Sequence, residues 1–369
     1  MTVPRTARGF HELTVDRVRP QTADGRAIRF AVPDHLAETF RFVPGQYLTL
    51  RAEIDGHDVR RSYSICAPEL AAPEIGIKRV EGGAFSTFAM GLAPGDTVEV
   101  MPPQGRFTAA PDAARNLLLV AAGSGITPCL SIAASTLAAG GRATLVYGNR
   151  ATATVMFREE VDALKDRHTD RFQLFHVTSR EPQDVAFLHG RVDGERIHAL
   201  AERGLLAVET FDAAYLCGPE GMIESVSKAL VAHGMAQDAV RFELFGSFTS
   251  GRDGSKRDGP ERNEPGHEGP KREARPDATI AFLIDGSRRD VPIDLAAQTA
   301  LEAGRAAGLD LPFSCAGGMC CTCRAKVVEG EVTMDANYSL EPWELEQGYA
   351  LACQARPKGD GVVMDFDAA

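Results

Sequence analysis

Long apolar runs are absent from this 369-residue chain. None approaches the roughly 18–20 consecutive apolar residues that a membrane-spanning helix needs. The opening residues, MTVPRTARG, also lack the apolar core of a secretion signal. We therefore expect a soluble, cytoplasmic protein with no membrane partner.

An excess of basic charge is also missing. The chain has 40 Lys and Arg against 51 Asp and Glu, a net charge of −11, which argues against nucleic acid as a partner. Residues 278–369 alone contain 14 acidic and 7 basic residues, a charge of −7. Such an acidic face could steer this segment onto a basic partner, although a merely solvated surface is at least as common.

Internal repeats are absent, and the chain instead divides into three folded segments and a linker. Residues 1–108 contain short alternating strands separated by Asp-Gly and Pro-Gly turns, which favours an antiparallel β-barrel. Residues 109–246 alternate apolar strands with helical segments, as in a doubly wound α/β nucleotide-binding domain. Residues 247–277 are charged and rich in Gly and Pro, which predicts a flexible linker. Residues 278–369 begin with a predicted hairpin and carry a cysteine loop.

A second C-x2-C pair, which a structural zinc site would favour, is missing from this loop. Instead, Cys315, Cys320 and Cys323 have C-x4-C-x2-C spacing, and Cys353 follows downstream. This is the pattern of plant-type [2Fe–2S] ferredoxins. The spacing therefore predicts an iron–sulfur cluster held by these four thiolates, with Cys321 outside the ligand set.

In the barrel segment, an R-x-Y-S motif falls at the end of a predicted strand. Its arginine can neutralise a phosphate, its tyrosine can stack on a planar heterocycle, and its serine can hydrogen-bond a ring nitrogen. A glycine turn that opens a short helix follows and suits a pyrophosphate. Taken alone, the motif would usually be a strand with one exposed face. The residues concerned are Arg61, Ser62, Tyr63, Ser64, Gly82, Gly83, Phe85 and Ser86.

The Rossmann fingerprint G-x-G-x-x-G is absent from the α/β segment. In its place, G-x-G-x-x-P stands between a buried strand and a helix, where glycines allow phosphate or ribose to approach the backbone. A simple tight turn is the alternative interpretation. The predicted nucleotide-binding residues here are Gly123, Gly125, Ile126, Thr127 and Pro128.

The acidic residue that an NAD site usually places about 20 positions beyond the glycines is missing as well. Arg150 stands after the next strand, and Ser179-Arg180 after the one following. Arginines favour a 2′-phosphate, so we expect NADPH, although two solvated arginines are about as consistent with this pattern.

A C-G-P-x-G-M motif follows the last strongly apolar strand of this segment, at the carboxyl end where open α/β sheets bind ligands. A lone cysteine at this position would more often be a small buried hydrophobe. The residues of interest are Cys217, Gly218, Pro219 and Met222.

In this order, the motifs resemble the ferredoxin–NADP reductase superfamily. The fused plant-type ferredoxin segment narrows the resemblance to reductase components of multicomponent oxygenases. Several stretches are most similar to the reductase components of ring-1,2-phenylacetyl-CoA epoxidases, among them FHELTV, RRSYSIC, AAGSGITP, YGNR, HGRVDGE and NYSLEP. The resemblance covers nearly the whole chain except the linker, which is longer and more charged than expected.

The resemblance implies FAD in the barrel, NADPH on the α/β domain and a [2Fe–2S] cluster in a C-terminal β-grasp domain. Arg61 would contact the flavin pyrophosphate, Tyr63 would stack on the isoalloxazine, and Ser64 would approach its N5 atom. Residues 83–86 would hold the pyrophosphate.

For the nucleotide, the resemblance implies that residues 125–128 and 217–222 place nicotinamide and ribose, and that Ser179 and Arg180 meet the 2′-phosphate. Glu243 falls where the superfamily often has a carboxylate near the hydride-transfer centre, although it could equally be a surface strand position. Ser64, Cys217 and Glu243 are therefore the candidate catalytic residues.

The implied function is electron transfer from NADPH through FAD and [2Fe–2S] to a di-iron oxygenase component, namely the epoxidase subunits of phenylacetate catabolism. A ring-hydroxylating dioxygenase or a steroid hydroxylase fits the same cofactor motifs. A non-catalytic iron–sulfur redox sensor is a third interpretation, which the complete set of flavin and nucleotide motifs disfavours.

Overall fold

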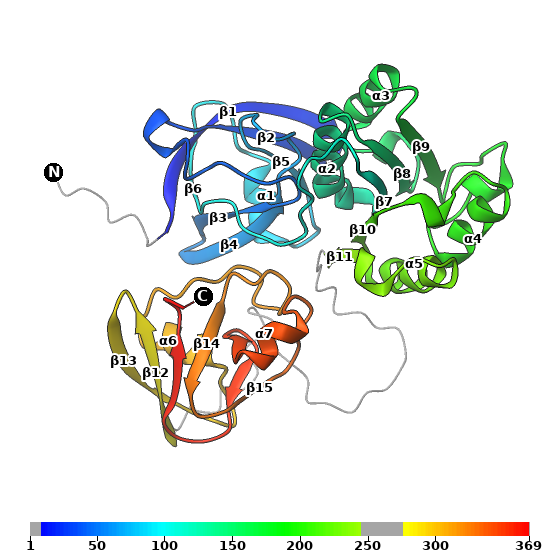
Figure 1. Ribbon diagram of the computed structural model, residues 1–369. Coiled ribbons are helices and arrows are strands. Elements are labelled where there is room, and N and C mark those ends of the chain that lie inside the picture. The colour runs from blue at the N-terminus through cyan, green and yellow to red at the C-terminus, as the bar shows by residue number, and fades with distance from the viewer. Residues whose placement is uncertain (1–8, 245–275, 369) are drawn as a thin grey trace. The chain divides into compact units, whose positions relative to one another are not determined.

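The computed structural model describes residues 9–244 and 276–368 (Figure 1). The chain forms two compact units, Met1–Phe245 and Gly246–Ala369. Nearly all of the predicted linker, residues 247–277, lies outside the described residues. Within the described parts, no helix combines the length and apolarity that crossing a membrane requires.

The first unit begins with the expected antiparallel barrel. Its six-stranded sheet has the order β4-β3-β6-β1-β2-β5, and a bridge between Ile65 and Ile75 joins the end of β4 to β5. Asp55 and Gly56 both adopt positive φ between β3 and β4, which suits a tight hairpin turn. The elements are β1 (His11–Thr22), β2 (Gly25–Ala31), β3 (Tyr47–Ile54), β4 (His57–Ser64), β5 (Glu74–Lys78), α1 (Ala84–Ala89) and β6 (Thr97–Val100).

The second module of this unit is a parallel five-stranded sheet with the order β11-β10-β7-β8-β9. Leu117 and Leu119 of β7 face the core shared with α2 and α3, whereas Leu118 and Val120 face α4 and α5. The apolar run is therefore buried on both faces, as in a doubly wound sheet. Its elements are β7 (Asn116–Ala122), α2 (Ile126–Ala138), β8 (Arg142–Asn149), α3 (Arg158–Arg167), β9 (Phe172–Thr178), α4 (Gly194–Glu202), β10 (Ala213–Gly218), α5 (Glu220–Ala232) and β11 (Val240–Leu244).

The barrel has an apolar core of its own, and a second buried cluster extends from the α/β module into the barrel segment. Ala27 and Phe107 of the barrel segment belong to the same buried cluster as the residues of α2. The buried Ser131 hydroxyl donates to the carbonyl of Ala67 at 2.6 Å, which links α2 to the barrel. The two modules of the first unit therefore pack directly against each other.

The second unit is a mixed sheet with the order β13-β12-β18-β14-β16, in which β12 and β18 are parallel. Its first two strands form the predicted hairpin, and Thr299 caps α6 in a capping box with Glu302. This is the β-grasp arrangement expected for the segment. Its elements are β12 (Ala278–Ile284), β13 (Ser287–Ile293), α6 (Ala300–Ala306), β14 (Arg324–Glu329), β15 (Val332–Met334), α7 (Pro342–Glu346), β16 (Tyr349–Leu351), β17 (Ala355–Pro357) and β18 (Val362–Asp365).

Candidate functional site

The R-x-Y-S motif occupies the last four residues of β4, beside α1. The ring of Tyr63 lies 5.8 Å from that of Phe85 between centroids, and burial raises the pKa of Tyr63 so that the phenol stays neutral. Arg61 is exposed, whereas the Ser62 hydroxyl lies 3.1 Å from the Thr49 hydroxyl on β3. Tyr63 and Arg61 are thus placed to offer an aromatic surface and a cation, while Ser62 contacts the neighbouring strand.

The glycine turn before α1 is held closed by Ser86. The Ser86 hydroxyl accepts from the amide of Val80 at 3.0 Å and lies 3.2 Å from the carbonyl of Gly83. A Cβ on Gly83 would stand 2.7 Å from that hydroxyl, and Gly82 has a φ of +72°. The Ser86 hydroxyl therefore shapes the turn. A pyrophosphate bound here would be held by backbone amides.

The three candidate catalytic residues come together where the two modules of the first unit meet. The Ser64 hydroxyl, at the end of β4, donates to Oε2 of Glu243 at 3.1 Å. Glu243 on β11 is the register partner of Cys217 on the parallel strand β10. The fold thus joins one residue of the barrel with two of the α/β module.

Burial raises the pKa of Glu243 to about 7, partly offset by the hydrogen bond from Ser64. Burial and the nearby Glu243 also raise the pKa of Cys217, which keeps it a neutral thiol. Because its pKa lies near the working pH, the Glu243 carboxyl can hold or release a proton at this junction.

The G-x-G turn lies at the carboxyl end of β7, next to β10, where the strand order of the sheet reverses. Gly123 has a φ of +55°. A Cβ on Gly125 would overlap the carbonyl oxygen of Cys217 and stand 2.6 Å from its carbonyl carbon. The two predicted motifs therefore touch through backbone atoms, and only glycine fits at position 125.

The remaining residues of these two motifs are buried or contact the backbone of their own turns. Ile126 and Pro128 are buried in α2, and the Thr127 hydroxyl donates to the carbonyl of Ser124 at 3.0 Å. Pro219 precedes α5, and the Met222 side chain covers Gly218, where a Cβ would stand 2.5 Å from the Met222 methyl carbon. These side chains shape the two turns.

Two arginines meet at the carboxyl ends of β8 and β9. The amide of Arg180 donates to the carbonyl of Arg150 at 2.8 Å, and the amide of Ser179 donates to the carbonyl of Asn149 at 3.0 Å. Both arginines are exposed. The backbones of two exposed arginines are thus adjacent at this edge, beside Ser179, and their cations would suit a phosphate.

Asn149 is a residue that the sequence interpretation did not single out. Its Nδ2 atom is buried and makes no hydrogen bond of good geometry among the described residues, although its side chain interacts with the Tyr147 hydroxyl. A buried donor whose hydrogen bonding is incomplete is costly, so an acceptor supplied by a nucleotide fits this edge of the sheet. Its position beside Arg150 in the Y-G-N-R stretch was the signal that could have identified it.

The four predicted cluster ligands form two thiol pairs. The thiol of Cys315 is hydrogen-bonded to that of Cys320, and the thiol of Cys323 to that of Cys353. Hydrogen bonding within the pairs lowers the pKa of Cys315 and of Cys353, so that each pair contains one group that favours the thiolate. Across residues 9–244 and 276–368, no three His, Cys, Asp or Glu side chains are grouped to hold a single metal ion. Two pairs of thiols fit a two-iron cluster with four cysteine ligands.

The backbone of the cysteine loop supports this arrangement. The amides of Gly317 and Met319 both point at the Cys315 sulfur, at 3.4 Å. Cys321 has a φ of +54°, and its thiol donates to the carbonyl of Ser339. Its side chain is therefore engaged by a different loop, as expected for a residue outside the ligand set.

A flavin-type barrel, a nucleotide-type α/β sheet and a ferredoxin-type cysteine loop together define an NAD(P)H-dependent flavin and iron–sulfur oxidoreductase. Family models for an oxidoreductase FAD-binding domain, an oxidoreductase NAD-binding domain and a 2Fe-2S iron-sulfur cluster binding domain match residues 12–109, 119–228 and 282–358. The chain belongs to the family of oxygenase reductase components that combine these three domains.

Two relatives illustrate the match. The chain is 42% identical to one of the subunits of the 1,2-phenylacetyl-CoA epoxidase of Escherichia coli (strain K12), over 97% of this chain and 98% of the relative. It is 35% identical to the ferredoxin reductase component of a 3-ketosteroid-9-alpha-monooxygenase from Rhodococcus rhodochrous, over 96% of each chain. Among solved structures, phthalate dioxygenase reductase aligns with a TM-score of 0.58 at 25% identity, over 97% of this chain and 98% of that one.

These findings confirm the predicted fold class, the reductase activity and the cofactors FAD, NAD(P)H and [2Fe–2S]. When bound, NAD(P)H would supply the hydride, FAD would accept it, and the [2Fe–2S] cluster would carry one electron at a time. The choice of NADPH over NADH and the roles of individual residues stay predictions.

Proposed function

We propose that this protein is the reductase component of a phenylacetyl-CoA epoxidase and delivers electrons from NADPH to di-iron epoxidase subunits in phenylacetate catabolism. The observation that carries the proposal is the 42% identity to a protein of such an epoxidase over nearly the full length of both chains. We also propose that it works in the cytoplasm.

The proposed roles follow the three-part organisation, with boundaries at about residues 108, 246 and 277. Arg61 and Tyr63 hold the flavin, aided by the backbone at Gly82 and Gly83. Ser64 and Glu243 hold a proton beside the flavin, and the Glu243 pKa of about 7 supports exchange of that proton at neutral pH.

On the α/β module, the turns at Gly125 and Gly218 bring the backbone close to the nicotinamide half of the nucleotide. Arg150 and Arg180, with Ser179, bind the 2′-phosphate, which supports NADPH. Cys315, Cys320, Cys323 and Cys353 ligate the cluster.

The proposal is tested by NADPH oxidation in the fully loaded protein with candidate epoxidase subunits, with and without phenylacetyl-CoA. Strong stimulation by phenylacetyl-CoA supports both the reductase chemistry and the partner. Cytochrome c reduction without such stimulation would remove the proposed partner and leave the reductase activity in place.

The second candidate is a steroid monooxygenase as the electron acceptor, because the 35% identical relative is a reductase component of that kind. Stimulation by a 3-ketosteroid with its oxygenase, and not by phenylacetyl-CoA with the epoxidase subunits, would favour this alternative.

A further inference from the structure

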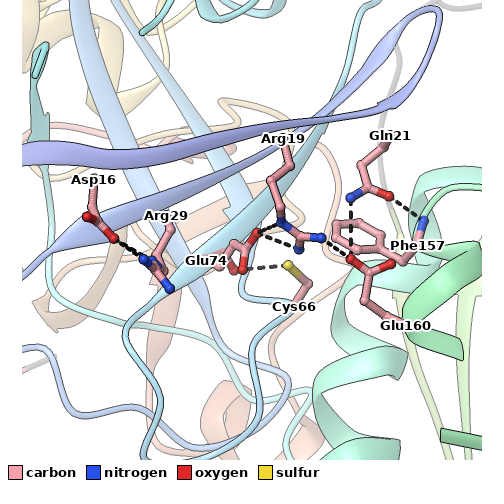
Figure 2. A network of polar contacts seen from close by, with 8 residues as sticks. All are labelled: Asp16, Arg19, Gln21, Arg29, Cys66, Glu74, Phe157 and Glu160. Carbon is pink, nitrogen blue, oxygen red and sulfur yellow. Dashed lines mark hydrogen bonds and ion pairs between the residues drawn. The ribbon is translucent and has the colours of Figure 1, made fainter. Parts of the chain in front are cut away.

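A network of polar contacts joins the barrel to the α/β module through α3 (Figure 2). Arg19 on β1 donates to Glu74 of β5 through Nε and Nη2, at 3.2 and 2.8 Å, and forms an ion pair with Glu160 of α3. The side chains of Arg19, Glu74 and Glu160 are only 30%, 13% and 27% exposed, so solvent screens these pairs less than it screens a surface pair. One guanidinium therefore links the two modules.

Gln21, two residues further along β1, fixes the start of α3. Phe157 precedes the first helical residue with a φ of +55°, a conformation that a bulky residue rarely adopts. Its amide donates to Oε1 of Gln21 at 2.8 Å, and Nε2 of Gln21 lies 3.5 Å from Oε1 of Glu160. The start of this helix is thus capped by a side chain of the barrel, and the N-cap residue Phe157 makes no capping hydrogen bond through its own side chain.

The Phe157 ring also lies against the barrel. A Cβ on Gly76 of β5 would stand 2.7 Å from the Phe157 ring and 2.5 Å from the Thr127 methyl group. The backbone of β5 therefore packs tightly on the residue that Gln21 caps and on the nucleotide turn.

From α3 the contacts continue to the predicted nucleotide turn. The Tyr147 hydroxyl lies 3.2 Å from the carbonyl of Met156, next to Phe157, and 3.0 Å from the carbonyl of Gly123. Tyr147 is fully buried on β8, so this hydroxyl has no competing solvent contact. The hydroxyl has a single proton, which the two carbonyls must share, so a series of polar contacts and covalent links runs from β1 of the barrel to the G-x-G turn.

We propose that Arg19 and Gln21 are positioning residues for hydride transfer. They fix the start of α3, and through Tyr147 the G-x-G turn, relative to the flavin-binding barrel. Hydride transfer requires the donor and acceptor atoms to be held near contact, and a displacement of about 1 Å can slow such a step by about 100-fold. The inference concerns the step from NAD(P)H to FAD and is independent of which oxygenase receives the electrons.

The test compares R19M and Q21L with the wild type in fully loaded protein. R29M is the matched control, because Arg29 pairs with Asp16 inside the barrel and, among the described residues, forms no hydrogen bond or ion pair with α3 (Figure 2). We expect R19M and Q21L to lower the limiting rate of flavin reduction at saturating NADPH by roughly fivefold, in the range that mutations along coupling networks produce. NADP⁺ affinity should change by less than about twofold, because the two arginines predicted to bind the 2′-phosphate lie on the α/β module alone.

A second readout does not depend on turnover. Hydrogen–deuterium exchange at residues 157–161 and 123–127 should accelerate in R19M and Q21L and stay at the wild-type rate in R29M. E160Q should also slow flavin reduction, and adding R19M to E160Q should have a smaller effect than R19M alone, because the two residues act through one contact.

Two outcomes overturn the inference. One is a wild-type limiting rate in both R19M and Q21L. The other is an equal loss of rate in R29M, since the effect would then reflect general destabilisation of the barrel.

Discussion

Replacing Glu243 with glutamine keeps the shape of the side chain and an acceptor for the Ser64 hydroxyl, and removes the ionisable group. Burial raises the pKa of Glu243 from its ordinary value of 4.5 to about 7. That difference corresponds to about 3 kcal/mol of free energy between the two protonation states. The folded wild-type protein therefore carries a penalty whenever this carboxyl is ionised.

The direction of the pH dependence follows from proton linkage. Below about pH 4.5 the carboxyl is protonated in both the folded and the unfolded state, so E243Q and wild type should be equally stable. Between about pH 4.5 and 7 the unfolded chain releases the proton while the folded protein retains it, and the stability of the wild type falls relative to E243Q. We expect E243Q to be more stable by about 3 kcal/mol at pH 8 and by less than about 1 kcal/mol at pH 5.

The assay is denaturant unfolding of loaded wild type, E243Q and E38Q at pH 5, 6, 7 and 8, followed by circular dichroism. E38Q is the control because the Glu38 side chain is 81% exposed. In parallel, the pH profile of flavin reduction should show an apparent pKa near 7 in the wild type, which E243Q lacks. A stability difference between E243Q and wild type that is constant from pH 5 to 8, or that grows toward low pH, would refute the reasoning.

Three further predictions concern the other parts of the site. G125A should abolish nucleotide-dependent flavin reduction and lower the unfolding temperature, because the new Cβ overlaps the Cys217 carbonyl, whereas G359A, with open space around it and outside the nucleotide-binding motifs, should do neither. C353S should remove the visible absorption of the iron–sulfur cluster, and C321S should retain it; equal loss in both would contradict the ligand set. R150Q combined with R180Q should reduce the ratio of kcat/KM for NADPH over NADH by about tenfold or more, and an unchanged ratio would refute the 2′-phosphate assignment.

Several features could be predicted because they depend on residues close together in the chain. The C-x4-C-x2-C spacing identifies a cluster loop, since three ligands on one loop need only local geometry. The apolar run at 117–121 identifies a strand buried on both faces. Local turn chemistry likewise identifies the hairpin at Asp285-Gly286.

Other features could not be predicted because the same local pattern allows different contacts. Ser86 fits a phosphate-binding role in the sequence, but its hydroxyl is engaged by the backbone of Val80 and Gly83. Asn149 looks like an ordinary polar residue in the sequence, but the fold buries its amide nitrogen with incomplete hydrogen bonding among the described residues. Hydrogen-bond satisfaction depends on the packed neighbours of a group, which spacing does not specify.

By itself, the sequence determined the order of the modules, the predicted cofactor motifs and the C-x4-C-x2-C loop, because each of these depends on a short stretch of chain. Only the tertiary structure decided that Ser64 meets Glu243 across 179 residues and that Gln21 caps Phe157 across 136. Such contacts arise when separately folded sheets pack together. The packing depends on the shape and burial of whole surfaces, so no local pattern encodes which side chains will meet.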